Sequence, residues 1–349
     1  MGAGRVTLQT IADALGVSRT TVSNAYNRPD QLAPDLRERI LARARELDYA
    51  GPDPAARRLR SGRREAFGLL FTDDLGYAFT DPAAVLLLQG VARVVEDAGT
   101  ALLIVPTGER HAPRELIRNA VVDGFCAYSF WDDHPALAAV LERRLNLVVV
   151  DEPYLPEHHF VGIDDRGGAR DLARHVVGLG HRRVGILADR LAGDGFVGFA
   201  DERRLAAATY RVTRERIAGY LEGGVALDAA TVAVQSGNSR DHGRAGAHAL
   251  MDRAPDLTAV LATTDQLALG ALDALRARGL DVPERVSLTG FDDIPEAAAA
   301  DPPLTTVRQP LLRKGEEAGR LLVDAPAEPR RVLLPLELVV RASTAPRLR

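Results

Sequence analysis

Four polar residues near position 20 have side chains of types that can contact DNA: Arg19, Thr20, Ser23 and Asn24. Their spacing would place them on one face of a helix. An arginine guanidinium matches O6 and N7 of guanine, and an asparagine amide matches N6 and N7 of adenine. Serine hydroxyls can bond phosphates, which the N-terminus of a helix also attracts. The polar, solvent-facing side of an ordinary helix has the same composition, so spacing alone leaves both interpretations open.

Three short helices are predicted to position these residues. Apolar residues at i, i+3, i+4 and i+7 from Leu8 predict a first helix with Thr7 as its N-cap and Gly16 at its end. Ser18 is placed to cap a second helix, which carries the four polar residues, and a third helix follows. The first 50 residues therefore predict a three-helix unit.

The composition of the whole chain indicates the kind of protein to which this three-helix unit belongs. The chain has 349 residues, of which 46% are hydrophobic and 26% charged, as in globular protein with two or three domains. Residues 1–64 carry 12 arginines against 7 acids, a charge of +5, which leaves −9 on the rest of the chain. A small basic head on a large acidic body suggests that the head is a polyanion-binding module. The alternative is an ordinary basic end of a chain, since such ends are common and a charge of +5 is modest, so the asymmetry alone is weak support for nucleic-acid binding.

Several classes of protein are disfavoured. The longest stretches without a charge have eleven residues, whereas a membrane-spanning helix needs about 20 apolar residues. The N-terminus lacks the apolar segment of a secretory signal, so we expect a cytoplasmic protein without membrane contact. Cys126 is the single cysteine, and the histidines at 158, 159, 242 and 248 fit solvated or capping roles better than metal ligation. We expect no metal site.

From Ala66 onward, apolar strands alternate with helical segments in two series, over 66–151 and 166–291. One long helix is predicted over about 202–222. Because the strands are continuous apolar runs, we expect them to be buried on both faces, in parallel sheets covered by helices. Two doubly wound subdomains are predicted, with ligands at the carboxyl ends of their strands.

Such sheets also serve enzymes, but the common signatures of enzymes are missing. No strand is followed by GxGxxG, no GKS or GKT occurs, and no GxSxG nucleophile elbow is present. We therefore expect neither an enzyme nor a bound cofactor.

The run VTLQTIADALGVSRTTVSNAYN, over residues 6–27, resembles the helix-turn-helix headpiece of the LacI/GalR family of bacterial transcription regulators. The resemblance implies base contacts in double-stranded DNA for Arg19, Thr20 and Asn24. It implies phosphate contacts for the remaining polar positions: Thr7, Ser18, Ser23 and Asn27.

Family members follow the headpiece with a short hinge helix, and here Asp53 can cap a helix over residues 54–59. The resemblance places Arg58 and Leu59 at the DNA, with Leu59 wedged into the minor groove at the centre of the operator. A flexible linker is the alternative, and we expect it when DNA is absent.

The rest of the chain resembles the effector-binding domain of the same family, which is similar to periplasmic sugar-binding proteins. Matching stretches include TTDQLALGALDALRARGLDVPERVSLTGFDDIPEAAAADPPLTTVRQP, over residues 263–310, and LPLELVVRAST, over residues 334–344. The implied fold is a small all-α helix-turn-helix domain followed by an α/β periplasmic-binding-protein-like domain made of two doubly wound parallel-sheet subdomains.

The expected boundaries follow from these resemblances. We expect the headpiece, the hinge helix or linker, and the effector-binding and dimerisation domain at residues 1–50, 51–64 and 65–349. Within the last of these, we expect an N-subdomain at about 65–163 and 292–322, and a C-subdomain at about 164–290 and 323–349.

Recognition of a polyol needs a carboxylate that accepts from its hydroxyls, an arginine that donates, and an aromatic face. Asp151 and Asp265 stand at the carboxyl ends of predicted strands, and the resemblance assigns the ligand-binding arginine to Arg216. Phe79 and Trp131 are candidate stacking groups. The alternatives are a helix N-cap for Asp265, a surface salt bridge for Arg216, and core packing for the two aromatic residues.

Two functions remain open. The first is a repressor that binds a near-palindromic operator as a homodimer and responds to a sugar or sugar derivative in the cleft between the subdomains. A homodimer is expected because the chain ends at VVRASTAPRLR, without the leucine heptads that tetramers of the family can use. The second is a cytoplasmic sugar-binding or sugar-processing protein whose N-terminal helices mediate an interaction.

Overall fold

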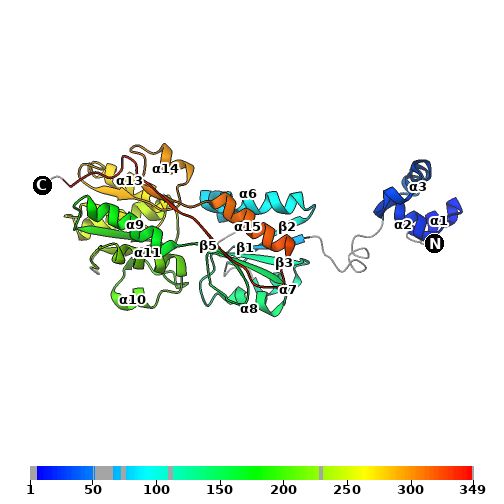
Figure 1. Cartoon of the computed structure of the whole chain (residues 1–349), viewed down its shortest axis with the longest axis horizontal. Helices are drawn as coiled ribbons and strands as arrows, with labels where there is room; N and C mark the ends of the chain where they lie inside the picture. The colour runs from blue at the N-terminus through cyan, green and yellow to red at the C-terminus, as the bar shows by residue number, and fades with distance from the viewer. Residues whose placement is uncertain are drawn as a thin grey trace. The chain divides into compact units, whose positions relative to one another are not determined.

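The computed structural model describes residues 6–49, 51, 66–71, 76–108, 113–227 and 231–347. The chain divides into two compact units, Met1–Arg64 and Glu65–Arg349, which are drawn in Figure 1. The expected hinge residues Asp53, Arg58 and Leu59 lie outside the described part of the chain. None of the helices in the described ranges is long and apolar enough to cross a membrane.

The described part of the first unit consists of short helices: α1 (Leu8–Leu15), α2 (Arg19–Asn27), the 3-10 turn η1 (Pro29–Gln31) and α3 (Pro34–Glu46). Thr7 caps α1, and Gly16 ends it in the left-handed conformation, with φ 66°. The Ser18 hydroxyl caps α2. The core of this unit contains fully buried residues from each α-helix: Ile11 and Ala12 from α1, Val22 from α2 and Ile40 from α3. The three-helix prediction is confirmed.

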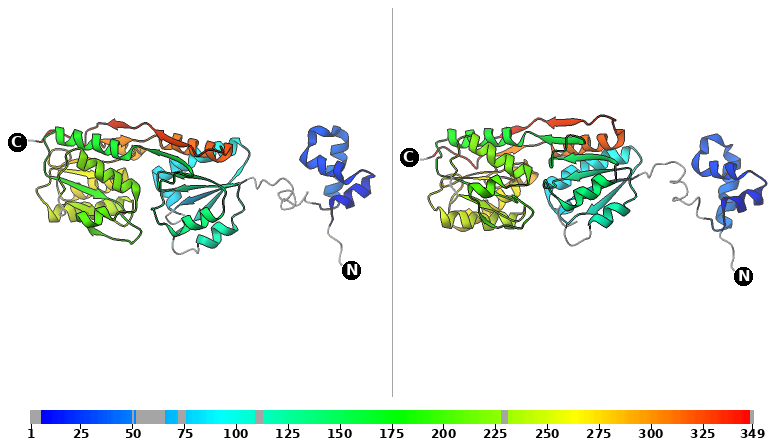
Figure 2. Two further views of the ribbon diagram at one scale, coloured as in Figure 1. Left: turned by 60° about the horizontal axis from the view of Figure 1, so that its bottom comes forward. Right: turned by 90° about the horizontal axis from the view of Figure 1, so that it is seen from below.

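The second unit contains two large sheets, which Figure 2 shows beside one another. The first sheet has six parallel strands in the order β12-β5-β4-β3-β1-β2. Its strands are β1 (Ala66–Phe71), β2 (Ala101–Pro106), β3 (Gly124–Tyr128), β4 (Asn146–Val150), β5 (His159–Ile163) and β12 (Arg331–Leu334). The helices of this first subdomain are α5 (Tyr77–Thr80), α6 (Pro82–Asp97), α7 (Pro113–Asn119), α8 (Pro135–Glu142) and α15 (Leu311–Asp324).

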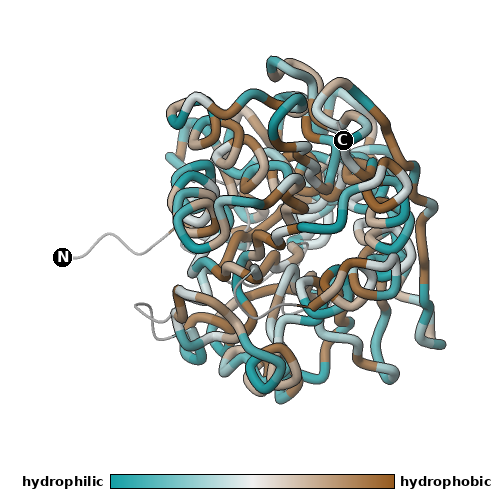
Figure 3. Tube along the Cα trace, turned by 90° about the vertical axis from the view of Figure 1, so that its left-hand side faces the viewer, coloured by the Kyte–Doolittle hydropathy of each residue, from teal (hydrophilic) through white to brown (hydrophobic). Residues whose placement is uncertain are grey.

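Helices cover both faces of this sheet. Successive side chains of a strand point to opposite faces, so Leu69 packs in one core with α6 and α15, while Leu70 packs in another with α7 and α8. Brown, hydrophobic segments alternate with teal, hydrophilic segments along the trace in Figure 3. This double burial explains why the strands read as continuous apolar runs in the sequence.

The second subdomain is built around a five-stranded sheet in the order β10-β9-β6-β8-β7, in which only β7 runs antiparallel to its neighbour. Its strands are β6 (Val184–Ala188), β7 (Gly198–Phe199), β8 (Val232–Val234), β9 (Ala259–Ala262) and β10 (Ser287–Thr289). Its helices are α9 (Asp165–Gly178), α10 (Glu202–Ala206), α11 (Arg211–Glu222), α12 (Arg240–Arg253), α13 (Asp265–Ala277) and α14 (Pro295–Ala299). The predicted α/β architecture of two sheets is confirmed.

The expected boundaries between the subdomains are wrong near the C-terminus. The prediction places residues from 323 onward in the second subdomain, but β12 pairs in parallel with β5 of the first sheet. It places residues from 292 in the first subdomain, but Ile294 and Leu304 pack in the core formed by α12 and α13. The chain crosses between the subdomains after β5, after β11 (Thr306–Arg308) and after β12, and β11 pairs antiparallel with β13 (Glu337–Val339).

The long helix predicted over about 202–222 is also wrong, because the chain forms two helices there. α10 ends at Ala206, and the backbone N–H groups of Thr209 and Tyr210 both donate to the carbonyl oxygen of Leu191 instead of continuing the helix. The helical periodicity of the sequence predicts one continuous helix, but these two hydrogen bonds to Leu191 end α10 before α11 begins. The break places α11 at the junction of the two subdomains.

Candidate functional site

The polar residues predicted to read DNA lie together on α2. Arg19, Thr20 and Asn27 are exposed, and Ser23 and Asn24 are half-buried. The Asn27 amide donates to the Ser23 hydroxyl at 3.1 Å. The spacing of these five residues puts them on neighbouring turns of one helix, where a major groove could receive them.

Two hydroxyls predicted to contact phosphate already serve as helix caps. The Thr7 hydroxyl accepts from the backbone N–H of Thr10 at 3.3 Å, and the Ser18 hydroxyl accepts from that of Thr21 at 3.0 Å. Both caps are exposed, and each hydroxyl also lies within hydrogen-bond distance of a second hydroxyl, at 3.1 Å for Thr7 and Thr10 and at 2.8 Å for Ser18 and Thr21. A hydroxyl has one donor and two acceptor positions, so each cap keeps one position for a further partner. Phosphate contacts from these positions remain predictions.

In the second unit, Arg216 of α11 lies at the carboxyl ends of the strands and is only 5% exposed. Its Nε donates to Asp165 Oδ1 at 2.9 Å, and its Nη1 donates to the carbonyl oxygen of Thr263 at 2.6 Å. Nη1 is also 3.4 Å from Asp292 Oδ1, and the guanidinium lies 3.7 Å above the ring of Phe291. Arg216 is therefore a buried residue with acidic partners, not part of a surface salt bridge.

Asp292 is a partner of Arg216 that the sequence analysis missed. It follows β10, just as Asp151 follows β4, so the same rule of a carboxylate after a strand could have found it. Burial raises the pKa of Asp292 well above its usual range, while the Arg216 guanidinium acts in the opposite direction. For Arg216, burial alone would lower the pKa, but Asp165 and Asp292 together raise it.

Asp151, which the sequence analysis did assign to the site, is bound by a buried lysine. Lys314 of α15 has no exposed surface, and its Nζ is 2.7 Å from Asp151 Oδ1 and 3.0 Å from Oδ2. The same ammonium donates to Oε1 of Gln309, whose Nε2 donates to Asp292 Oδ1 at 2.6 Å. Arg211 donates to the carbonyl oxygen of Asp151 at 3.2 Å.

These contacts close into a ring of seven residues that spans both subdomains. Arg211 completes it, because its Nη1 is 3.8 Å from Asp165 Oδ2. We call this set the junction ring: Asp151, Lys314, Gln309, Asp292, Arg216, Asp165 and Arg211. It contains three cations and three carboxylates, and apart from Arg211 its members are at most 7% exposed.

Asp265, which was expected to bind the effector, does not belong to the junction ring. It is fully buried, and its Oδ2 accepts from the backbone N–H of Ile294 at 3.0 Å. Its Oδ1 accepts from the Thr306 hydroxyl at 2.7 Å, and burial raises its pKa to about 6. The N-cap of α13 is Thr264, so the capping alternative for Asp265 is wrong, whereas effector binding by Asp265 stays a prediction. Asp265 instead links the first turn of α13 to Ile294, at the start of α14, and to Thr306 in β11.

The two candidate aromatic residues have different surroundings. Phe79 in α5 is 58% exposed. Trp131, which follows β3, is half-buried at the junction, with its ring centroid 5.6 Å from that of Tyr210. A Cβ on Gly193 would lie 2.8 Å from the indole, so this position is filled closely by Trp131. Trp131 thus contacts the opposite subdomain.

A second polar contact joins the subdomains beside Trp131. α11 has no side-chain cap of its own, and Glu152 from the first subdomain accepts from the backbone N–H of Val212 in its first turn at 2.9 Å. The Ser129 hydroxyl donates to the other carboxylate oxygen at 3.0 Å. Burial raises the pKa of Glu152 to about 8, although these two hydrogen bonds lower it.

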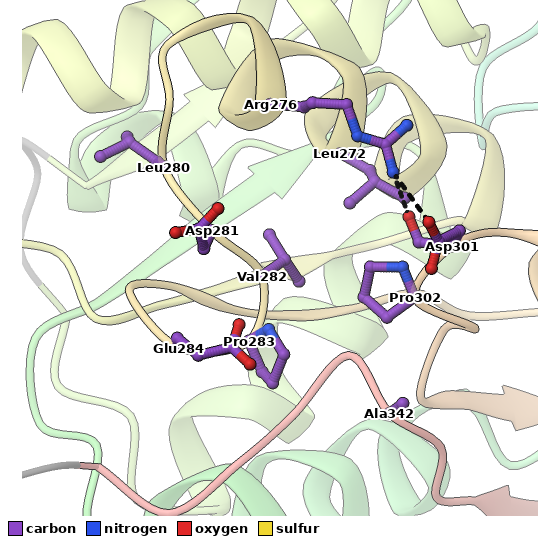
Figure 4. Close-up of a pocket in the computed structure, with 10 residues that line it drawn as sticks. All are labelled: Leu272, Arg276, Leu280, Asp281, Val282, Pro283, Glu284, Asp301, Pro302 and Ala342. Atoms are coloured by element: carbon purple, nitrogen blue, oxygen red, sulfur yellow. Dashed lines mark hydrogen bonds and ion pairs between the residues drawn. The ribbon is translucent and has the colours of Figure 1, made fainter.

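A pocket of about 490 Å³ lies at the other end of the strands of the second sheet, away from the junction ring (Figure 4). It is lined by the last turns of α13 and by the loop that precedes β10, at the amino ends of the strands. Its one cation, Arg276, is exposed and paired with Asp301. Because ligands of such sheets bind at the carboxyl ends of strands, the junction ring is the better candidate site.

Comparisons with known proteins agree with this division of the chain. Residues 7–51 match the family model of bacterial regulatory proteins, lacI family, and residues 173–344 match the periplasmic binding protein-like domain. An HTH-type transcriptional regulator of Mycobacterium tuberculosis is 46% identical, over 98% of this chain and 97% of the relative.

Two solved structures cover nearly the whole chain. A transcriptional regulator of the LacI family from Corynebacterium glutamicum has 38% identity and a TM-score of 0.72, over 99% of both chains. A complex of the transcriptional regulator CelR with cellobiose has 30% identity and a TM-score of 0.70, over 97% of this chain and 100% of that chain. The chain therefore belongs to the LacI family of DNA-binding transcriptional regulators.

Proposed function

We propose that this regulator is a repressor whose affinity for its operator is set by a sugar or sugar derivative bound at the junction ring. The observation that carries the proposal is the buried Arg216, held between Asp165 and Asp292 at the carboxyl ends of strands. An arginine can donate to one hydroxyl of a ligand, and the carboxylates beside it can accept from adjacent hydroxyls of the same ligand. The cellobiose complex of CelR supports a carbohydrate as the ligand class.

The ring also contains an acceptor that a hydroxyl could use. Asp165 Oδ2 is buried and accepts no hydrogen bond from the described protein atoms, with the Arg211 guanidinium 3.8 Å away. A buried carboxylate oxygen without a donor costs about 1–3 kcal/mol or more. A ligand hydroxyl that donates to it would recover this free energy, which favours a polyhydroxy ligand.

On the DNA side, we infer that two copies of the chain bind together. One headpiece carries a single recognition helix and can read only a half-site, so a homodimer fits a near-palindromic operator in double-stranded DNA. Arg19, Thr20 and Asn24 are proposed to read bases, while Thr7, Ser18, Ser23 and Asn27 bind phosphates. Arg58 and Leu59 of the linker are proposed to reach the minor groove.

A binding experiment on DNA tests the proposal. The full chain is titrated onto the DNA upstream of its own coding sequence and onto shuffled DNA of equal length, at several salt concentrations. We expect specific binding to the upstream DNA, with an affinity that falls steeply with salt because phosphate contacts release counterions. Equal affinity for both DNAs at every salt concentration would contradict sequence-specific recognition.

The effector arm uses Arg216→Met, with Arg174→Met as its control, since Arg174 is an exposed arginine of α9. A panel of sugars is added to preformed complexes of protein and DNA. We expect at least one sugar to change the operator affinity of the parent and of the control, but not that of Arg216→Met. An Arg216→Met variant that binds DNA and responds like the parent would contradict the proposed site.

A further inference from the structure

Lys314 is an exceptional residue in this chain. The chain has 44 basic residues of the lysine and arginine types, and Lys314 is the only lysine among them. Its side chain has no exposed surface. It lies in the first turns of α15, next to the crossover that follows β11. A cation that is fully buried needs partners that neutralise and hydrogen-bond it, and Lys314 has such partners in the junction ring.

The contacts of Lys314 use its whole donor capacity. An ammonium group has three N–H donors, and Nζ meets three acceptor atoms, which are both carboxylate oxygens of Asp151 and Oε1 of Gln309. No donor is left for a ligand. Lys314 therefore acts through its neighbours.

The first neighbour it orients is Gln309. With Oε1 held by the ammonium, the Nε2 group of the same amide donates to Asp292 Oδ1 at 2.6 Å. That oxygen lies 3.4 Å from Arg216 Nη1. Lys314 thus fixes, through one amide, the carboxylate that faces the ligand-binding arginine.

The second effect is on charge. With Lys314 in place, the junction ring balances three cations against three carboxylates, and each cation already has an acidic partner within 4 Å. An anionic ligand would bring an additional charge into a buried site without a counter-ion, which is costly. An uncharged hydroxyl needs only a donor and an acceptor.

We propose that Lys314 is a positioning and specificity-determining residue, which orients Gln309 and Asp292 and adapts the junction ring to an uncharged polyhydroxy ligand. The inference rests on the proposed function of the ring as an effector site. An arginine would not replace this lysine, because its planar fork of five donors cannot converge on three acceptors around one nitrogen.

The test compares neutral and anionic ligands on the full-length protein. The probes are ribose, glucose, cellobiose and a series of linear and cyclic polyols, each paired with its phosphate ester, and the readout is the thermal unfolding midpoint. We expect neutral probes to stabilise the parent and their esters to leave it unchanged. Stabilisation by an ester as large as that by its neutral form overturns the inference while the proposed effector site stands.

Three variants distinguish the effect of the charge of Lys314 on ligand binding from its effect on folding. Lys314→Met should reduce the affinity for the best neutral probe at least tenfold, because Asp151 loses its counter-ion and Gln309 its anchor. Asp151→Asn in the same chain restores neutrality with two cations and two carboxylates, so the double variant should fold and keep the preference for neutral probes. The control is Arg313→Met, which removes an exposed cation one residue away and should match the parent.

Each result has one meaning. A Lys314→Met variant with the parent's affinity and selectivity overturns the inference, and so does a double variant that binds esters as well as neutral probes. If Lys314→Met does not fold, the selectivity of the double variant decides. A parent that binds no probe of either charge overturns the proposed effector site itself, and the inference with it.

Discussion

Replacing Glu152 by glutamine is expected to stabilise the protein increasingly as the pH rises from 5 to 8. Burial raises the pKa of Glu152 in the folded state to about 8, whereas the unfolded chain has the ordinary value near 4.5. Between these values the unfolded state loses its proton and the folded state keeps it, so the parent loses stability as the pH rises. Glutamine mimics the protonated side chain and does not titrate, and it can still accept from Val212 and donate to Ser129.

The size of the expected stabilisation follows from the difference between the pKa of Glu152 in the folded and the unfolded state. While one state is ionised and the other is not, the free energy of unfolding changes by about 1.4 kcal/mol per pH unit. Between pH 5 and pH 7, the advantage of Glu152→Gln over the parent should therefore grow by about 3 kcal/mol. Urea unfolding followed by circular dichroism at each pH measures this difference.

The control is Glu157→Gln, because Glu157 is an exposed carboxylate in the same loop. Its unfolding curves should run parallel to those of the parent at every pH. If the Glu152→Gln curves also run parallel to those of the parent, Glu152 is ionised in the folded protein. The account of its burial at the junction would then be refuted.

Further substitutions test the DNA-binding role of α2 and the packing of the second unit. Asn24→Ala should lower the binding free energy for the preferred operator by about 1–3 kcal/mol and remove the base preference at one position of each half-site. Ser23→Ala should lower the affinity for all DNA sequences alike, and selection from random DNA measures both effects. Asp265→Ala should lower the free energy of unfolding by about 1–3 kcal/mol, measured in urea, because it leaves a buried N–H and a buried hydroxyl without their acceptor. Gly90→Ala should cost about 1–3 kcal/mol in the same assay, because its Cβ would collide with the backbone oxygen of Leu312 in α15.

Local signals explain why the helices of the headpiece could be predicted. Thr7 and Ser18 cap the helices that follow them, and Gly16 adopts the left-handed conformation that ends α1. Each of these residues acts within four positions of the element it defines. The break between α10 and α11 had no such signal, because it depends on the carbonyl oxygen of Leu191, which is far away in the sequence.

The candidate site could be predicted only in part for the same reason. The position after a strand is a local property, and it found Asp151 but could not distinguish Asp292 from Asp265, since both follow strands. Tertiary packing decides between them, by turning Asp265 toward Ile294 and away from the ring. Lys314 meets its partner across 163 residues of sequence, so no local pattern pairs the two.

The central claim is that a ligand at the junction ring changes the affinity for DNA. The most direct measurement is the dissociation constant of the full chain for DNA selected by the protein itself, determined by fluorescence anisotropy with and without the best neutral probe. A coupling of about 1–3 kcal/mol predicts a change of about 5- to 150-fold for the parent. The same probe should leave the constant of Arg216→Met unchanged. A parent whose dissociation constant is the same with and without a bound probe would contradict the account.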